Sequence, residues 1–295
     1  MRINFVWAAL LLLPHLVVLG QTKKHFEVKD PRSCQRIEFT LNASSGTCAI
    51  RTRNGKMPIS IMGNHNEEFV STDFGQKYSG QVLHAWLNLS DNGKENFGRQ
   101  LSKIFGAKSI DKDNYWNIYF TNYRPYRLDL TYGVGKAYVD LSDIAVENCR
   151  IKSGNAFVEV GYLSKEPNRM EMDSLIINVD MGDIEIKRLN LARAKNVMAK
   201  VGFGSLLLDF EETPEKACDI WASVGAGSLV VHLPENEMPV LIHMKQTNYR
   251  KFKMPLGFTE ISENTFVNQS YAVDAKNLQT FNIDLSMGSV EFRNE

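Results

Sequence analysis

One short motif recurs along the chain and constrains its fold more than any other feature. It is clearest at residues 196–210, NVMAKVGFGSLLLDF, where two alternating apolar runs meet at a Gly-Phe-Gly corner. Similar stretches occupy residues 128–141, 175–186, 220–233 and 281–292. Apolar residues alternate with a period of two on both sides of each corner, which is typical of strands with one buried face. Each copy therefore predicts a strand, a tight glycine corner and a second strand.

The glycine corners also set a repeat length. Counting a degenerate first copy and a final copy, we place structural corners at Gly46, Gly135, Gly154, Gly182, Gly204, Gly227 and Gly288. Between Gly135 and Gly227 successive corners lie 19 to 28 residues apart. Repeats of this length predict an all-β, β-solenoid-like stack in which each unit packs on its neighbours. Glycine suits such corners because it adopts positive φ readily and lets the backbone of the next unit approach closely.

The rest of the chain fits around this stack. Residues 21–33 are polar and predict an unstructured lead-in, and residues 34–126 predict an N-terminal β region. Within that region, residues 95–105 carry apolar side chains at helical spacing and predict one short helix. Residues 127–295 hold the repeats, and we expect them to form one continuous domain with residues 34–126. Residues 234–279 interrupt the spacing and predict a longer, less regular unit of the same domain.

The first 20 residues have the composition of a secretory signal. Arg2 precedes an apolar run from Phe5 to Leu19 that is broken only by Pro14 and His15. The alternative is an uncleaved membrane anchor, for which this run is at the lower limit of length. The prediction is therefore a protein exported to the periplasm or surface of a bacterium.

Four cysteines remain in the exported chain, at Cys34, Cys48, Cys149 and Cys218, so three pairings are possible. Cys34 and Cys48 flank the same predicted hairpin, which makes them the preferred disulfide. The chain has no Cys-x-x-Cys motif, so thioredoxin-like and zinc-ribbon folds have no support.

Composition and motifs argue against several functions. The chain has 34 basic and 34 acidic residues, so no overall positive field favours nucleic acid. The Gly-x-Gly corners lack a third glycine and lead into a strand, whereas nucleotide phosphates bind at the start of a helix. The histidines show no metal-binding spacing. We therefore expect no nucleotide, metal, cofactor or catalytic residues.

Two groups of side chains remain as candidates for function. The first is a basic and aromatic strip in the irregular unit, formed by Lys245, Tyr249, Arg250, Lys251, Phe252 and Lys253. Such a strip can bind a glycan or an anionic surface, although a solvated loop explains it equally well. The second is a row of carboxylates on the solvated face, of which Asp129, Asp140 and Asp209 are the alternative catalytic set of a polysaccharide-active enzyme.

The repeated pattern, the leader and the run SVGAGSLVVHLPENEMPVLIHM at residues 223–244 resemble the toast-rack and adhesin-like families of exported bacterial proteins. These include the C-terminal domain of cell-wall-stress response regulators. The similarity is best from Arg127 onward, and residues 56–126 depart from the pattern. The resemblance implies a β-solenoid-like stack in the cell envelope, without known catalytic residues. Our hypothesis is a non-enzymatic scaffold or adhesin-like binding protein, with an envelope glycan or a membrane or envelope protein as partner. A sensor partner of a membrane protein remains a third possibility.

Overall fold

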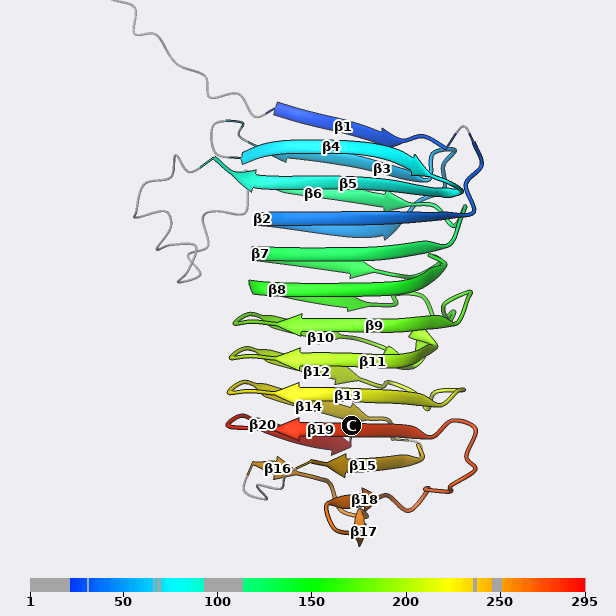
Figure 1. Ribbon diagram of the computed structural model, residues 1–295, viewed down its shortest axis with the longest axis vertical. Helices are drawn as coiled ribbons and strands as arrows, with labels where there is room; N and C mark the ends of the chain where they lie inside the picture. The colour runs from blue at the N-terminus through cyan, green and yellow to red at the C-terminus, as the bar shows by residue number, and fades with distance from the viewer. Residues whose placement is uncertain are drawn as a thin grey trace, which may run out of the picture.

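The computed structural model describes residues 22–30, 32–65, 67, 70–92, 114–235, 238–245 and 251–294. These residues form strands stacked in two face-to-face layers along one long axis (Figure 1). The all-β solenoid-like stack expected from the repeats is thus confirmed. The leader at residues 1–20 and the helix expected at residues 95–105 lie outside the described residues.

Each repeat is one rung of the stack, with its first strand in one layer, a corner, and its second strand in the other layer (Figure 1). Three long strands run through the corner and belong to both layers: β2 (Arg36–Thr52), β7 (Tyr126–Asp140) and β8 (Val146–Gly161). Four later rungs are strand pairs: β9 (Met172–Val179) with β10 (Asp183–Ile186), β11 (Ala194–Val201) with β12 (Ser205–Asp209), β13 (Cys218–Val224) with β14 (Ser228–Leu233), and β19 (Gln279–Leu285) with β20 (Ser289–Asn294). We call the layer with β9, β11 and β13 the front layer, and the layer with β10, β12 and β14 the back layer.

Neighbouring rungs pair in parallel, with equivalent residues in register. Leu206 is opposite Leu229, and Leu208 is opposite Val231. The side chains of Leu208 and Val231 are completely buried between the layers. Because side chains alternate along a strand, the next residue, Asp209, points to the outer face, where its side chain is 15% exposed. The period-two ladders expected from the sequence are therefore confirmed.

The corners stack in a column in which one rung contacts the next through backbone atoms. A Cβ placed on Gly204 would lie 1.8 Å from the carbonyl oxygen of Gly182, and one on Gly227 would lie 2.2 Å from that of Gly204. Close approach is thus the main reason for glycine here. Positive φ applies at the corners of the long strands, at Gly46 (108°) and Gly135 (118°).

One glycine was assigned to the wrong corner position from the sequence. In the register of β7 and β8, Ala156 lies opposite Gly135, the second glycine of the β7 corner. Gly154 therefore lies opposite Gly133, the first glycine of that corner. A Cβ on Gly182 would meet the carbonyl oxygen of Ala156 at 2.2 Å. Ala156 therefore occupies the column in this rung, and measuring to it changes the spacings of 19 and 28 residues to 21 and 26.

The order of the rungs in space differs from their order in the sequence at both ends of the stack. The first half of β2 lies between β5 and β7, and its second half lies between β6 and β7. At the other end, β19 lies between β13 and β15. At each end, the chain therefore skips one position in the stack and fills it later. These positions are filled by β5 and β6 at the N-terminal end and by β19 at the C-terminal end.

Antiparallel strands close both ends of the stack. At the N-terminal end these are β1 (Thr22–Val28), β3 (Ile59–His65) and β4 (Val70–Ser79), packed beside β5 (Val82–Asp91) and β6 (Tyr115–Phe120). At the C-terminal end they are β17 (Thr259–Ser262) and β18 (Thr265–Val267), beside β15 (Val240–Met244), while β16 (Phe252–Lys253) pairs with β20. Residues 22–28, expected as an unstructured lead-in, are instead an edge strand. Their polar composition suits an edge, where charged side chains discourage further strand pairing.

The expected disulfide between Cys34 and Cys48 is not formed, and all four cysteines are buried free thiols. The reason lies in the shape of β2. Cys34 precedes the first half of this strand, whereas Cys48 follows the corner at Gly46 in the other layer. The seven residues 37–43 extend for roughly 20 Å between the two positions, which is far beyond the reach of a disulfide.

A single 3₁₀ turn, η1 (Leu189–Ala192), is the only helical element among the described residues. No helix in this part of the chain combines the length and apolar character needed to cross a bilayer.

Candidate functional site

The outer surface of the front layer carries an apolar row where the alternation predicts solvent-facing residues. Ile176 on β9, Met198 on β11 and Trp221 on β13 occupy equivalent positions of three neighbouring rungs and are in register. We call these three residues the apolar strip. Toward the N-terminal end, the next two positions of the same row are Arg150 and Asp129. The fold therefore does not require apolar residues at this level.

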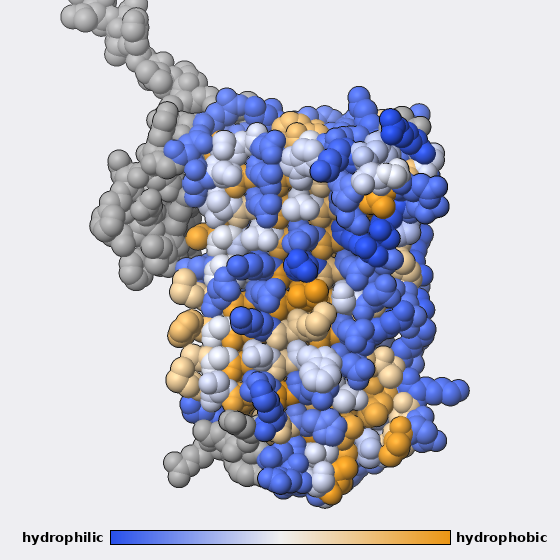
Figure 2. All heavy atoms as spheres, in the orientation of Figure 1, coloured by the Kyte–Doolittle hydropathy of each residue, from blue (hydrophilic) through white to orange (hydrophobic). Residues whose placement is uncertain are grey.

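The strip is open to solvent. Trp221 is 56% exposed and Met198 is 41% exposed, and both line a shallow groove with a volume of about 570 Å³. Figure 2 shows this face, with hydrophobic surface between polar side chains. Such a volume is within the range of ligand-binding clefts. A groove on stacked parallel strands also has a rigid floor, because every rung is held by a full backbone ladder.

Polar side chains frame the strip on both sides. Two residues further along each strand, toward the corner, lie Asn178, Lys200 and Ser223, and two residues back lie Ser174, Asn196 and Asp219. Beyond Trp221 the row continues with Asn282 and His243. The Lys245 ammonium lies 2.9 Å from the Asp284 carboxylate at the far end of the groove. Amide, hydroxyl and ammonium groups therefore surround a narrow apolar floor.

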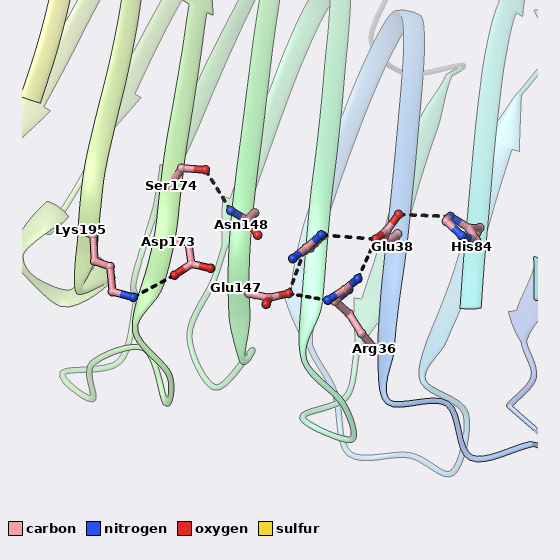
Figure 3. A network of polar contacts seen from close by, with 9 residues as sticks. Arg36, Glu38, His84, Glu147, Asn148, Asp173, Ser174 and Lys195 are labelled. Atoms are coloured by element: carbon pink, nitrogen blue, oxygen red, sulfur yellow. Dashed lines mark hydrogen bonds and ion pairs between the residues drawn. The ribbon is translucent and has the colours of Figure 1, made fainter. Parts of the chain in front are cut away.

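The N-terminal half of the same face has a different character. Arg127 donates to Glu147 at 2.8 Å, and Arg36 lies 3.3 Å from the same carboxylate (Figure 3). Glu38 lies 3.4 Å from Arg36 and 3.2 Å from His84. The hydrogen bond to Glu147 raises the pKa of Arg127. These side chains satisfy one another, so this half of the face offers few unpaired groups to a ligand.

The basic and aromatic strip expected from the sequence does not form one surface. Lys245 lines the groove beside the apolar strip, whereas the Lys251 ammonium contacts the carbonyl oxygen of Met287 at the corner edge. Phe252 is buried at 6% exposure, in contact with Phe292 and Phe266. It is therefore part of the core and was wrongly assigned to a binding surface.

The remaining members of that group are on other surfaces or lie outside the described residues. Lys253 is exposed on β16, opposite Glu291 in the back layer. Tyr249 and Arg250 lie outside the described residues. The sequence could not separate these positions, because the irregular unit crosses from one layer to the other within a few residues.

The three alternative catalytic carboxylates are divided between the layers. Asp129 lies in the front layer, 3.5 Å from Arg150. Asp140 and Asp209 line a depression on the back layer. The Asp140 carboxylate accepts the backbone N–H groups of Ser142 and Leu163 at 3.0 and 3.2 Å. It therefore has a structural role in holding the turn.

Asp209 has a histidine neighbour rather than a second unpaired acid. Its carboxylate lies 3.5 Å from Nδ1 of His232 on the adjacent rung. Among the described residues, no group of three or more histidine, cysteine, aspartate or glutamate side chains is arranged to hold a metal ion.

A second apolar feature lines the edge of the stack where the corners lie. The residue between the two corner positions is Met181, Phe203, Ala226 or Met287 in the four later rungs, and Phe203 is 76% exposed. In the earlier rungs the equivalent residues are Ser45, Val134 and Asn155. Each of these residues is a single side chain at the end of a turn, and the shallow surface beside them is lined mainly by glycine and serine.

The apolar strip was missed from the sequence, although a signal was present. In VMAKV and IWASV the inward positions are apolar, as expected, but the outward positions include Met198 and Trp221. A single exposed apolar residue on a strand is ordinary. Aligning the outward positions of successive copies would have shown that three such residues fall at one level.

Comparison with known proteins gives a family and several solved structures of low similarity. Residues 21–174, 154 of the 295, match the family model of the N-terminal domain of toast_rack, DUF2154. The match therefore includes the N-terminal region that departs from the repeat pattern. No curated protein compared with the chain is significantly similar to it.

Three solved structures are similar along most of their length. A "putative cell adhesion protein" from Clostridium sporogenes has 14% identity and a TM-score of 0.46, with 94% of this chain and 100% of that chain covered. A "putative adhesin" from Bacteroides fragilis has 11% identity and a TM-score of 0.40, covering 94% and 97%. Another from Parabacteroides merdae has 12% identity and a TM-score of 0.35, covering 92% and 96%.

Proposed function

The chain belongs to the toast-rack N-terminal domain family, and on this scaffold we propose that it acts as an exported, non-enzymatic binding protein of the bacterial cell envelope, adhesin-like in function. The observation that carries the proposal is the apolar strip in its polar frame. Contiguous exposed apolar surface with a polar rim marks interaction sites. The stack itself has no need of the strip, since other rungs carry Arg150 or Asp129 at the same level.

A binding role fits the geometry better than catalysis. Hydrolysis of a glycosidic bond requires two carboxyl groups on either side of the scissile bond. Asp129 lies in the other layer from Asp140 and Asp209, and Asp140 is held by two backbone N–H groups. Asp209 is then the one acid of the back-layer depression that no backbone N–H holds among the described residues, and its side chain is only 15% exposed beside His232. A polysaccharide-active enzyme is therefore the weaker alternative.

Export is part of the same proposal. The apolar run near the N-terminus would direct the chain out of the cytoplasm. Fractionating the native cells and sequencing the N-terminus of the recovered protein tests this directly. We expect recovery from the envelope or periplasm with a mature N-terminus close to residue 21. Recovery from the cytoplasm with Met1 retained would contradict export. The binding role of the apolar strip would then rest on the retention assay alone.

The binding role is tested by retention on isolated envelope material. We would compare the wild-type chain with Met198→Ser/Trp221→Ser, in which the two most exposed residues of the apolar strip become polar. Tyr138→Ser is the matched control, since Tyr138 is 38% exposed on the outer surface of the back layer. We expect the double variant to lose retention with an unchanged melting temperature, and the control to bind like the wild type.

Two outcomes would count against the proposal. Equal retention of all three proteins would mean that the strip is not the binding surface. Turnover of an envelope polysaccharide by the wild type, abolished by Asp209→Asn, would establish the enzymatic alternative. A membrane protein that copurifies with the wild type and is lost from the double variant would instead identify the partner as a membrane component such as a sensor.

A further inference from the structure

Two tryptophans on the front layer occupy the same row and differ in one respect. Trp86 on β5 and Trp221 on β13 both lie on the outer face, in the row that also contains Met198, as the register through β2, β7, β8, β9 and β11 shows. The indole N–H of Trp86 donates to Asp73 at 3.1 Å, and its ring lies against Gly75 so closely that a Cβ there would be 2.2 Å away. Trp86 is therefore packed by its own edge strand.

Trp221 has no comparable partner in the described part of the chain. Its ring stacks on no other aromatic ring there, its N–H donates to no described residue, and 56% of its surface is exposed. A large exposed indole is uncommon, because burying such a ring contributes to stability wherever a neighbour is present. More than half of its surface is therefore open to a ligand, and its N–H group has no partner among the described residues.

The dimensions of the strip limit the kind of ligand. It is one side chain wide, because the positions two residues away on either side are polar, as at Asn196 and Lys200. Its length is two inter-strand spacings, about 10 Å. A standard protein interface buries roughly 800 Å² on each partner around an apolar centre. Three side chains in one row form a much smaller apolar surface.

A saccharide matches both the shape and the chemistry. One face of a pyranose ring presents C–H groups, while its hydroxyl groups point outward around the ring. The flat C–H face suits the indole, and the hydroxyls suit a frame of amide, hydroxyl and charged groups such as Asn178, Ser223 and Asn282. Ligand sites in general combine an apolar floor with a few placed polar groups.

We propose that the apolar strip is a saccharide-binding platform, on which a pyranose ring stacks on Trp221 and the chain of sugars runs across the strands toward Met198. This inference rests on the binding function proposed above, and it specifies the ligand class. Lys200 has no ion pair among the described residues and lies in register with Ser223. It would contact a hydroxyl or an acidic substituent of the bound sugar.

The test uses the mature chain with cello-, chito- and galacturono-oligosaccharides as probes. Binding is followed by tryptophan fluorescence and by chemical-shift changes of the indole N–H. We expect at least one of these probes to perturb Trp221 and to bind at least about tenfold more weakly to Trp221→Ala, since tenfold is 1.4 kcal/mol. Trp221→Phe should restore part of the affinity. Trp86→Phe is the matched control and should leave the affinity unchanged.

A second arm separates the ligand class from the binding function itself. Envelope material is treated with periodate, which cleaves vicinal diols, or with protease, before the retention assay. Retention that depends on Trp221, survives protease and is lost after periodate supports a saccharide. Retention that depends on Trp221 but is lost only after protease overturns the saccharide and leaves the binding function intact. Failure of both the probes and the envelope material to bind would overturn both proposals.

Discussion

The corner column offers the sharpest test of how the rungs are held together. Gly204→Ala adds one carbon atom at a position 1.8 Å from the carbonyl oxygen of Gly182. Ordinary van der Waals contact requires well over 3 Å. The neighbouring atom belongs to a backbone that is itself paired, so it cannot rotate away as a side chain could. We therefore expect the two rungs to separate locally by more than 1 Å, on the order of a fifth of the normal inter-strand spacing.

The cost follows from the hydrogen bonds that cross this corner. Gly202, Phe203 and Ser205 donate N–H groups to the preceding rung at 2.7, 2.8 and 3.1 Å. Losing three such bonds, each contributing about 1 kcal/mol net, destabilises the fold by roughly 3 kcal/mol. For a domain of this size that corresponds to a fall of about 6 to 12 °C in melting temperature.

The assay is thermal and urea unfolding followed by circular dichroism, with Gly55→Ala as the matched control. A Cβ at Gly55 would meet only the methyl group of Thr121, at an ordinary 3.7 Å. We expect the control to melt with the wild type. If Gly204→Ala is folded and melts within about 2 °C of the control, close approach at the corner does not limit the stability of the stack, and the physical reason given for the glycine column is wrong.

Four further predictions follow from the burial or exposure of single side chains. Leu208→Asp should abolish soluble expression, because it places an unpaired charge in a fully buried position. Asp209→Leu, on the outer face, should leave the melting temperature nearly unchanged. If the chain tolerates both changes equally, the alternation of buried and outward residues along this strand is wrong. The four thiols should resist iodoacetamide at pH 8 until the chain is unfolded, because burial raises the pKa of Cys34 to about 11 and of the other three to about 12. The pKa values of these thiols are higher in the folded chain than in the unfolded chain, so their contribution to the free energy of unfolding is complete below pH 9 and is lost as the pH rises. Urea unfolding should therefore show the stability falling between pH 9 and 12. A stability that stays constant over this range would contradict the prediction. Phe203→Ser should leave stability within about 0.5 kcal/mol of the wild type, as measured by urea unfolding, because the ring is 76% exposed and touches little.

The interior of the stack could be predicted from the sequence because the same physical requirement recurs in every rung. Alternation identifies which residues are buried, and the glycine spacing identifies where the chain turns. Leu206 and Leu229 follow the glycine corners of two successive copies at the same distance, and they are opposite one another. Each ladder joins equivalent positions of successive repeats, so aligning the repeats was enough to predict which residues lie opposite one another.

The ends of the stack could not be predicted in the same way. Placing β19 between β13 and β15 requires knowing which edges remain unpaired after the first rungs have formed. All these strands have the same alternating pattern, so any of them could pair with any other. The disulfide was misassigned for a related reason, since a strand that bends through a corner has the same pattern as a hairpin.

The candidate binding surface shows a third kind of limit. Inward residues are constrained by packing, but an outward residue contributes little to the fold, so its identity is free to vary among rungs. Function can therefore be added to the outer face without disturbing the ladders, and its residues are recognisable only once the register is known. Met198 and Trp221 became a surface when the rungs were aligned side by side.

The location of the apolar strip separates it from the features that define the family. The family match ends at residue 174, two positions before Ile176, the first residue of the strip. Membership of the toast-rack family therefore neither requires nor excludes the strip. Since the stack is built from equivalent rungs, changing outward residues on three adjacent strands would suffice to create, alter or remove a ligand site on an unchanged scaffold. On this reasoning, the backbone would allow Met198 and Trp221 to be transferred to the equivalent positions of other rungs. The side chains already at those positions would set the limit, such as Arg150 and Asp129, which form an ion pair at 3.5 Å.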